Sequence, residues 1–400
     1  MRGKKMRRGT LRNVLLSASA IFVTLGVLEL VIRACVWEKQ YHFPSGMLVL
    51  DAQVRHRLAP SFSGTLRDRE FDTGVRTNGL GMRDKEVEPP MHGRRRFLVM
   101  GDSFTFGEGV QESDAFPKRL ESLLNEGHAT PIVEVLNGGT PGYATIHQMR
   151  LLRRLLPKIQ PDVVILAFYV GNDLEYNDLS TNFSQLGLRL VDGKIAEPAN
   201  KPHSNFHRLK MLLANYSSLY RLVVHRARTS PTLSGLAYKT GLSEGHFEIP
   251  FDIQQFTKGS SENVEARWRD TDRLLREFQE LCTCEGCIPY MAIVPARLQY
   301  DQNLWTRALA QYGLDENLYD ARVVNRRLVD IARKHSIETV DLLPPFAQEA
   351  RVERFHYSWD GHWNAQGHAL VAQSLARYFR EKLLFFPKTM TAGGRGKTCS

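Results

Sequence analysis

Apolar residues along this chain form two kinds of pattern, and the first is a single long run near the N-terminus. No residue from Val14 to Leu28 is charged, and a mostly apolar stretch continues to Trp37. About 20 apolar residues are enough to cross a bilayer as a helix. Residues 1–12, directly before the run, carry six basic side chains and no acidic one. The pattern predicts a basic cytoplasmic head at residues 1–12 and a transmembrane signal-anchor at residues 13–37.

Two other interpretations of this segment, a cleaved signal peptide and a lipoprotein signal, stay open. The small residues at 17–20 lie too early in the apolar core to serve as a cleavage site, and Arg33 fits poorly in a lipoprotein signal that ends at Cys35. Glu29 and Arg33 are four residues apart, so they share one face of a helix and can pair. We expect an uncleaved, single-pass anchor in the inner (cytoplasmic) membrane, with the rest of the chain on the periplasmic or extracytoplasmic side.

Beyond residue 95 the second pattern begins, in which short apolar runs alternate with segments of helical spacing. The short runs are typical of strands buried in a parallel sheet. Strands are expected at 97–100, 132–136, 163–169, 290–294 and 338–341, and helices at 116–124, 145–156, 264–281, 321–334 and 367–383. We expect Ser113 or Asp114 to cap the first of these helices. The alternation predicts an α/β fold, with a mostly parallel sheet covered by helices on both faces.

Three stretches fall outside this alternation. Residues 38–95 contain four prolines and are expected to form a lead-in segment that wraps the main domain. The alternation breaks at about 175–262, which we interpret as an insertion or cap over the core, with a hairpin turn at 191–194 and an amphipathic helix at 209–224. Residues 386–400 are rich in glycine and basic residues and are predicted to be a disordered tail.

The distribution of basic residues bears on whether the chain binds nucleic acid or a membrane. The chain carries a formal charge of +10, but without the six basic residues of the head only about +4 is left. Hydrophobic residues make up 42% of the chain and charged residues 24%, which is typical of a globular protein. The basic excess therefore indicates a membrane partner and argues against nucleic acid.

Three of the five cysteines lie close together, in the run Cys282-Thr-Cys284-Glu-Gly-Cys287. This spacing allows a metal ligand set or a short-range disulfide. No second pair of Cys or His residues at zinc-finger spacing accompanies the run, so we expect partly buried or oxidised thiols at a helix end.

Three polar segments carry the candidate chemistry: Gly101-Asp-Ser103, Gly171-Asn-Asp173 and Asp360-Gly-His362. Each follows a predicted strand or lies in a loop near an end of the fold. In an open α/β sheet, functional sites form beyond the carboxyl ends of the strands. Any one of these segments is an ordinary turn on its own, but their joint order along an alternating chain indicates a catalytic site.

Ser103, Asp360 and His362 are expected to form a catalytic triad. A serine hydroxyl is a poor nucleophile without a base, so we expect His362 to accept its proton and Asp360 to hold the imidazole. The oxyanion that develops needs hydrogen-bond donors. We assign that role to the backbone N–H groups of Ser103 and Gly142 and to the side-chain amide of Asn172.

Three other histidines are alternatives for the base: His147, His356 and His368. His368 lies at the start of a predicted helix and is expected to cap or pack, whereas His356 lies close enough to the triad loop to support it. We expect Asp102 to fix the serine turn by hydrogen bonding rather than to catalyse.

Together these segments resemble the four sequence blocks of the SGNH or GDSL-like hydrolases, which supply a nucleophilic serine, a glycine, an asparagine and a histidine. The matching blocks are Gly101 to Gly107, Asn137 to Gly142, Gly171 to Asp173 and Asp360 to His362. The resemblance implies a flavodoxin-like three-layer α/β/α sandwich over residues 96–385. It also implies a serine esterase that acts through an acyl-enzyme.

Two details refine the resemblance. Residues 77–84 are similar to a lead-in found in membrane-anchored bacterial members. A single residue separates Asp360 from His362, and Trp363 follows, a form that resembles alginate O-acetyltransferase-like proteins. This form implies an O-acylated carbohydrate of the envelope as substrate. Ester hydrolysis is the first hypothesis; O-acyl transfer to polysaccharide hydroxyls and non-catalytic glycan binding are the alternatives.

No cofactor and no catalytic metal are indicated. The chain has no His-Glu-x-x-His motif, and no Gly-x-Gly-x-x-Gly motif follows a predicted strand.

Overall fold

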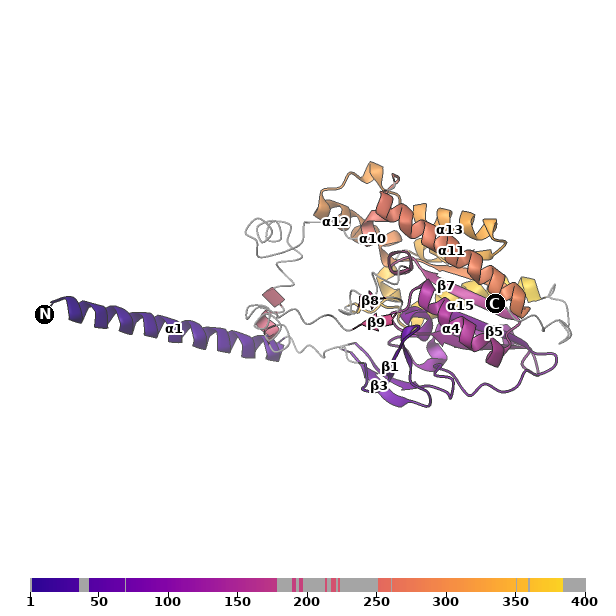
Figure 1. The fold of residues 1–400 in the computed structure, drawn as a ribbon, viewed down its shortest axis with the longest axis horizontal. Coiled ribbons are helices and arrows are strands. Elements are labelled where there is room, and N and C mark those ends of the chain that lie inside the picture. The colour runs from indigo at the N-terminus through magenta and orange to yellow at the C-terminus, as the bar shows by residue number, and fades with distance from the viewer. Residues whose placement is uncertain are drawn as a thin grey trace. The chain divides into compact units, whose positions relative to one another are not determined.

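The chain divides into two structural units, and the larger one contains the central sheet. The computed structural model describes residues 2–35, 43–68, 70–177, 251–259, 261–349, 351–358 and 360–383, with short pieces between 189 and 223 (Figure 1). One unit comprises Met1–Lys39 with Ala199–Glu248, and the other Gln40–Pro198 with Ile249–Ser400. The predicted tail at 386–400 lies outside the described residues.

Five parallel strands make up the central sheet. They are β5 (Arg95–Gly101), β6 (Val133–Gly139), β7 (Val163–Tyr169), β10 (Ile288–Val294) and β11 (Glu338–Asp341). Their order in the sheet is β11-β10-β7-β5-β6, and every neighbouring pair is parallel. This is the flavodoxin-like order, and the direction of winding switches between β5 and β7. The predicted α/β fold class is confirmed.

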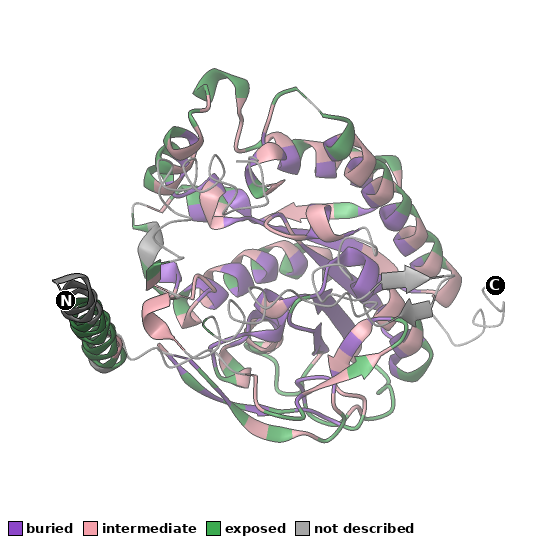
Figure 2. Ribbon diagram, turned by 60° about the vertical axis from the view of Figure 1, so that its left-hand side comes forward, coloured by how far each residue is buried: buried purple, intermediate pink, exposed green. Residues whose placement is uncertain are grey.

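Helices cover both faces of the sheet, because successive strand residues point to opposite faces and both sets are apolar. One layer contains α4 (Thr145–Ile159), α11 (Glu262–Glu285) and α13 (Val323–Lys334), and the other contains α3 (Phe116–Asn125) and α15 (Ala365–Leu383). Leu98 and Leu166 pack in the first layer, and Phe97 and Ile165 in the second. Figure 2 shows the buried strands between the helices, which makes a three-layer sandwich.

Helix α3 begins differently from the expectation. Its N-cap residue is Ala115, which follows a short 3-10 helix at Glu112–Asp114, so neither Ser113 nor Asp114 caps it. Pro117 lies in the first turn, where a missing N–H costs no helical hydrogen bond. A proline here starts the helix without a side-chain cap.

Most of the predicted insertion lies outside the described residues, including most of the amphipathic helix expected at 209–224. Strands β8 (Arg189–Val191) and β9 (Lys194–Ala196) pair antiparallel across the predicted hairpin turn. The core resumes before the expected boundary at 262, because Phe256, just after α10 (Phe251–Gln254), is buried in the main apolar cluster.

Two of the clustered cysteines, Cys282 and Cys287, are buried free thiols at the C-terminal end of α11. The Sγ atom of Cys287 lies 3.5 Å from the backbone oxygen of Cys282. These two thiols therefore do not form a short-range disulfide with each other, and they pack as small apolar groups.

The smaller unit contains α1 (Arg2–Cys35), the one helix among the described residues that is long and apolar enough to cross a membrane. Its apolar part runs from Arg12 to Arg33 with a mean hydropathy of 2.3. As expected, Glu29 and Arg33 pair, at 2.6 Å. The Glu29 carboxylate also accepts hydrogen bonds from the Ser217 hydroxyl and the Leu219 N–H, so part of the insertion contacts this helix.

The lead-in segment folds as two antiparallel hairpins in the same unit as the sheet. The first consists of β1 (Leu48–Asp51) and β2 (Arg55–Leu58), and the second of β3 (Ser63–Arg67) and β4 (Asp72–Arg76). The side chains of Leu58, Leu66 and Val75 pack against Phe106 in a separate buried cluster. The lead-in therefore covers the turn that follows β5.

Arg83 ties the lead-in to that turn through its buried guanidinium group, which donates to four backbone carbonyl oxygens. The acceptors are Gly74, Phe106, Gly107 and Val110, at 2.6 to 3.1 Å. The Phe106 ring lies 4.8 Å from the guanidinium carbon. Burial lowers the pKa of Arg83 to about 10, so the side chain stays cationic at neutral pH. One side chain thus fixes several loops at once.

We predict that Arg83→Met lowers the free energy of unfolding by about 3 kcal/mol, because buried carbonyl oxygens lose their donor. Urea unfolding of the full chain in detergent, followed by tryptophan fluorescence, measures this change. The matched control is Arg76→Met, on the exposed side of β4, which should change stability by no more than about 0.5 kcal/mol. Equal stability of the two variants would contradict the role given to Arg83.

Candidate active site

Ser103 lies at the carboxyl end of β5, where the chain turns at once into the short helix α2 (Ser103–Phe106). Asp102 caps this helix, and its carboxylate accepts the Phe104 N–H at 3.0 Å. A Cβ atom at Gly101 would collide with the side chain of Thr105, so the tight turn requires glycine. As the first residue of the helix, Ser103 has a backbone N–H with no acceptor inside the helix.

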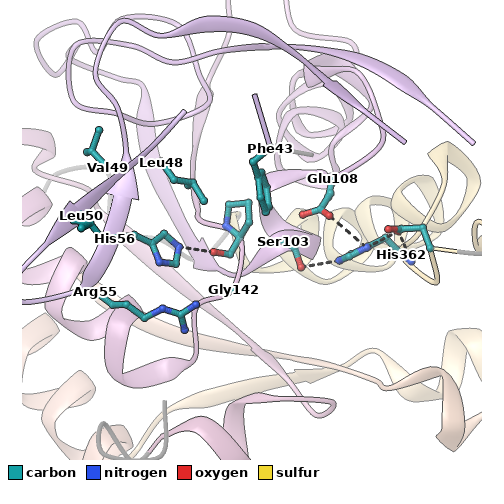
Figure 3. A pocket seen from close by; sticks show the side chains of 12 residues that line it. Phe43, Leu48, Val49, Leu50, Arg55, His56, Ser103, Glu108, Gly142 and His362 are labelled. Carbon is teal, nitrogen blue, oxygen red and sulfur yellow. Dashed lines mark hydrogen bonds and ion pairs between the residues drawn. The ribbon is translucent and has the colours of Figure 1, made fainter. Parts of the chain in front are cut away.

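The loop before α15 brings His362 to this serine (Figure 3). His362 Nε2 lies 2.8 Å from Ser103 Oγ, and His362 Nδ1 lies 2.5 Å from Asp360 Oδ1. The same carboxylate oxygen accepts the backbone N–H of His362 at 3.0 Å. Gly361 has a φ of +86°, in the region that favours glycine, and this conformation lets two residues separated by one position face each other. Hydroxyl, imidazole and carboxylate therefore form one continuous row.

Opposing effects act on the protonation of His362. Burial lowers the pKa of the imidazole, but the hydrogen bond to Asp360 and the negative charges of Glu108, Asp360 and Asp102 outweigh burial and raise the pKa to about 9. Burial raises the pKa of Asp360, but the hydrogen bond and the charge of His362 bring it below its ordinary value. In this resting arrangement the imidazole is a cation at neutral pH and the carboxylate is an anion.

Of the oxyanion donors expected from the sequence, Gly142 lines the same cavity as Ser103. It has a φ of +74°, which again favours glycine. Asn172 lies beside the serine turn, but its side-chain amide donates to Asp102 Oδ2 at 3.3 Å and to the Tyr143 carbonyl at 3.5 Å. It is not among the described residues that line the cavity. The structure therefore brings Asn172 to the site with its donor directed at Asp102.

None of the three alternative histidines has a hydrogen bond to Ser103 among the described contacts, and each ring has other partners. His356 Nδ1 lies 2.8 Å from the Gly361 oxygen and its Nε2 2.6 Å from the Tyr300 hydroxyl, so this ring braces the triad loop. His368 Nδ1 accepts the backbone N–H of Phe116, and His147 Nδ1 accepts that of Ala144. Burial lowers the pKa of His356 to about 4 and that of His147 and His368 to about 3. All three rings are neutral supports of the fold.

Two glutamates that the sequence did not single out contact the triad loop. Glu70, in the turn between β3 and β4, accepts the backbone N–H groups of Ser358 at 2.7 Å and of Asp360 at 3.1 Å. Glu108 is 3% exposed, and its Oε1 lies 3.8 Å from His362 Nδ1. In the sequence, the glycines on both sides of Glu108 are the only local sign of a special backbone position there. No local pattern indicates a role for Glu70.

A cavity of about 550 Å³ opens beside Ser103 (Figure 3). One part of the lining comes from the turn after β5, which carries Ser103 and Glu108 (the nucleophile turn), and from the loop that carries Asp360 and His362 (the triad loop). Another part comes from the β1–β2 hairpin and the chain just before it. The lead-in side chains in this lining are Phe43, Leu48, Val49, Leu50, Arg55 and His56. Arg55 has a φ of +73°, a conformation that is uncommon for residues other than glycine. The lead-in is thus part of the site.

Glu108, Asp360 and His362 offer three ligand atoms within 4.8 Å of one another, which is the kind of group that can hold a metal ion. Both ring nitrogens of His362 already face other groups, Nε2 the serine hydroxyl and Nδ1 the aspartate. A metal ion would have to displace one of these contacts. The donor set therefore fits an acid–base site better than a metal site.

Comparison with known proteins identifies the family. The sequence model of the GDSL-like lipase/acylhydrolase family matches residues 99–370, which is more than half of the chain. A search of curated proteins finds no match.

Similar solved structures include a lipase/acylhydrolase from Enterococcus faecalis, 13% identical with a TM-score of 0.36, over 72% of this chain and 96% of the other. A putative SGNH hydrolase from Slackia heliotrinireducens is 14% identical with a TM-score of 0.35, over 72% and 99%. A lipolytic protein of the G-D-S-L family from Veillonella parvula DSM 2008 is 13% identical with a TM-score of 0.36, over 72% and 98%. On the sequence match over residues 99–370, this chain belongs to the GDSL-like lipase/acylhydrolase family and is an esterase-type enzyme.

Proposed function

We propose that the protein is a serine acyl hydrolase that cleaves an ester through an acyl-enzyme on Ser103. The observation that carries this proposal is the row of contacts Ser103 Oγ to His362 Nε2, 2.8 Å, and His362 Nδ1 to Asp360 Oδ1, 2.5 Å. A hydroxyl within hydrogen-bond reach of a base, with the base oriented by a third group, is the arrangement that activates a serine nucleophile.

The first half-reaction forms the acyl-enzyme. The neutral imidazole of His362 accepts the hydroxyl proton as Ser103 Oγ attacks the ester carbonyl, and Asp360 stabilises the imidazolium. The backbone N–H groups of Ser103 and Gly142 are the proposed oxyanion donors, together with the Asn172 amide once it turns from Asp102. The imidazolium then protonates the leaving alcohol. In the second half-reaction His362 removes a proton from water, which attacks the acyl carbonyl. The bond from the acyl carbon to Ser103 Oγ then breaks, and the imidazolium gives its proton to Oγ, so the acid leaves and the serine hydroxyl and neutral imidazole are restored.

An opening to solvent favours hydrolysis over transfer. Leu50 lines the cavity and is 84% exposed, so the described part of the cavity is open to solvent at this residue. The proposed substrate is an O-acylated carbohydrate of the cell envelope, from the resemblance of the Asp-Gly-His-Trp segment. Trp363 does not take part in binding sugar, because it is fully buried and packs on the Phe104 and Phe346 rings. Its packing holds the loop that carries His362 against the buried core.

The proposed location is the inner membrane, with α1 as a single-pass anchor and the catalytic unit on the periplasmic or extracytoplasmic side. The basic head and the length of the apolar helix support this orientation.

Ser103→Ala is expected to abolish covalent labelling by a fluorophosphonate probe and to lower turnover of a chromogenic acetyl ester by about 10³-fold or more, because the nucleophile is lost. Intact-protein mass spectrometry reports the labelling. Ser113→Ala, an exposed serine in the 3-10 helix after the turn, is the control and should behave as the wild type. A Ser103→Ala variant that still hydrolyses the ester and accepts the probe would sink the assignment.

The pH dependence follows from the charge on His362. Only the neutral imidazole accepts a proton, and its pKa is raised to about 9, so kcat/KM should rise with pH and level off above about pH 9. The measurement is initial-rate kinetics with the spontaneous hydrolysis of the ester subtracted. A profile already level from about pH 6 upward would show that another group, or a differently tuned histidine, is the base.

Product analysis separates hydrolysis from transfer. With an acetylated oligosaccharide as donor and unmodified oligosaccharides as acceptors, we expect free acetate to be the product at every acceptor concentration, because the cavity admits water. Mass spectrometry of the sugars detects any newly acetylated acceptor. Acceptor acetylation that replaces acetate release would show that the enzyme is a transferase.

A further inference from the structure

We propose that Glu108 is a second carboxylate of the catalytic base: it acts on His362 together with Asp360, orients the imidazole and stabilises its charged form. This inference rests on the proposed function, because it assumes that His362 is the base. It assigns to Glu108 a positioning role, since the side chain acts through His362.

The position of Glu108 at the ring is the first observation. Glu108 Oε1 lies 3.8 Å from His362 Nδ1, the same nitrogen that faces Asp360 Oδ1 at 2.5 Å. The Glu108 side chain is almost fully buried and still lines the cavity that holds Ser103. Figure 3 shows the Glu108 carboxylate directed at the imidazole of His362. Two carboxylates thus converge on one nitrogen.

The backbone around Glu108 fixes this position. Gly107 and Gly109 have φ values of +82° and +86°, and the Gly107 and Glu108 N–H groups both donate to the Ser103 carbonyl. A Cβ at Gly107 would come within 2.6 Å of the Ala115 side chain, and one at Gly109 within 2.6 Å of the Tyr357 ring. The tight turn after α2 therefore requires glycine at positions 107 and 109, on both sides of Glu108.

Gly109 also links Glu108 to the triad loop. Its carbonyl oxygen accepts hydrogen bonds from the Tyr357 hydroxyl at 2.7 Å and from the Thr73 hydroxyl at 2.9 Å. The backbone N–H of Tyr357 in turn donates to the carbonyl of His362. The turn that carries Glu108 is therefore tied through Tyr357 to the backbone of His362, which fixes the carboxylate relative to the ring.

The negative charge of Glu108 acts on the protonation of His362. The charged and titratable groups around His362 are Asp102 and Glu108 from the turn after β5, Asp360 and His356 from its own loop, and His368 from α15. The Arg83 cation, behind the turn after β5, interacts with Glu108. Opposite charges within about 4–6 Å favour the charged form of a histidine. Asp360 already fills the hydrogen bond of Nδ1, so Glu108 acts as an added negative charge. It raises the pH at which the base becomes neutral, and it stabilises the imidazolium formed as Ser103 attacks.

The test compares Glu108→Gln with the wild-type full chain in detergent. The second-order rate of fluorophosphonate labelling of Ser103 and kcat/KM for a chromogenic ester are measured from about pH 5 to pH 10.5. Glutamine keeps the shape and removes the charge, so the midpoint of both profiles should fall by about one pH unit or more. The rate on the high-pH plateau should fall by less than about tenfold, because a less basic imidazole is a weaker base.

The control is Glu126→Gln, which removes one negative charge from a surface ion pair with Arg380 and should leave the midpoint unchanged. A midpoint does not depend on how much of a preparation is folded. If Glu108→Gln yields no folded protein, Glu108→Asp is measured instead. Its shorter side chain holds the charge farther from Nδ1, so the midpoint should move in the same direction by a smaller step.

A second measurement uses the other carboxylate. Asp360→Asn should keep a measurable rate because Glu108 still faces Nδ1, and adding Glu108→Gln should lower that rate by at least about tenfold more than it lowers the wild-type plateau. Profiles that coincide for Glu108→Gln and the wild type, with an active and labelled wild type, would overturn the role of Glu108 alone. A wild type that is not labelled at Ser103 at any pH would instead overturn the proposed function.

Discussion

The hydrogen bond between the Ser103 hydroxyl and the His362 ring joins two segments that are 259 residues apart, and the rest of the catalytic unit holds them together. The serine lies at the carboxyl end of β5, next to the point between β5 and β7 where the strand order reverses, which is where sites form in open α/β sheets. The histidine lies in the loop just before α15, and this helix packs on the face of the sheet that also carries α3. The sheet and α15 therefore fix the positions of the two segments, and the short loop before α15 brings His362 into contact with Ser103.

Hydrogen bonds from polar side chains hold the two loops that carry Ser103 and His362 in position. Glu70 accepts two backbone N–H groups of the triad loop, His356 holds the Gly361 carbonyl region, and Arg83 gathers the carbonyl oxygens of the nucleophile turn. Two of these three residues come from the lead-in, which also lines the cavity. A buried cation and directed carboxylates are costly unless each finds its partners, so they specify one arrangement of the loops. The lead-in is therefore a working part of the catalytic unit.

The sequence predicted those features that depend on local pattern. The apolar runs at 97–100 and 163–169 became β5 and β7 because buried parallel strands are apolar on both faces. Ser103, Asp360 and His362 could be named because their segments match family blocks at loop positions. The lead-in hairpins, Glu70 and Glu108 could not, since their roles come from contacts with residues distant in the chain. The cap at Ala115 was missed because Pro117 starts α3 without one.

The structure of the enzyme after reaction with a phosphonate ester tests the contact between Ser103 and His362 most directly. We expect phosphorus to be bonded to Ser103 Oγ, one phosphoryl oxygen to lie within about 3 Å of the Ser103 and Gly142 N–H groups, and His362 Nε2 to lie beside the serine oxygen. Asn172 should have turned from Asp102 toward the same phosphoryl oxygen. Phosphorus on another residue, or a phosphoryl oxygen directed away from both backbone N–H groups, would show that Ser103 is not the nucleophile of this site or that these N–H groups do not bind the oxyanion.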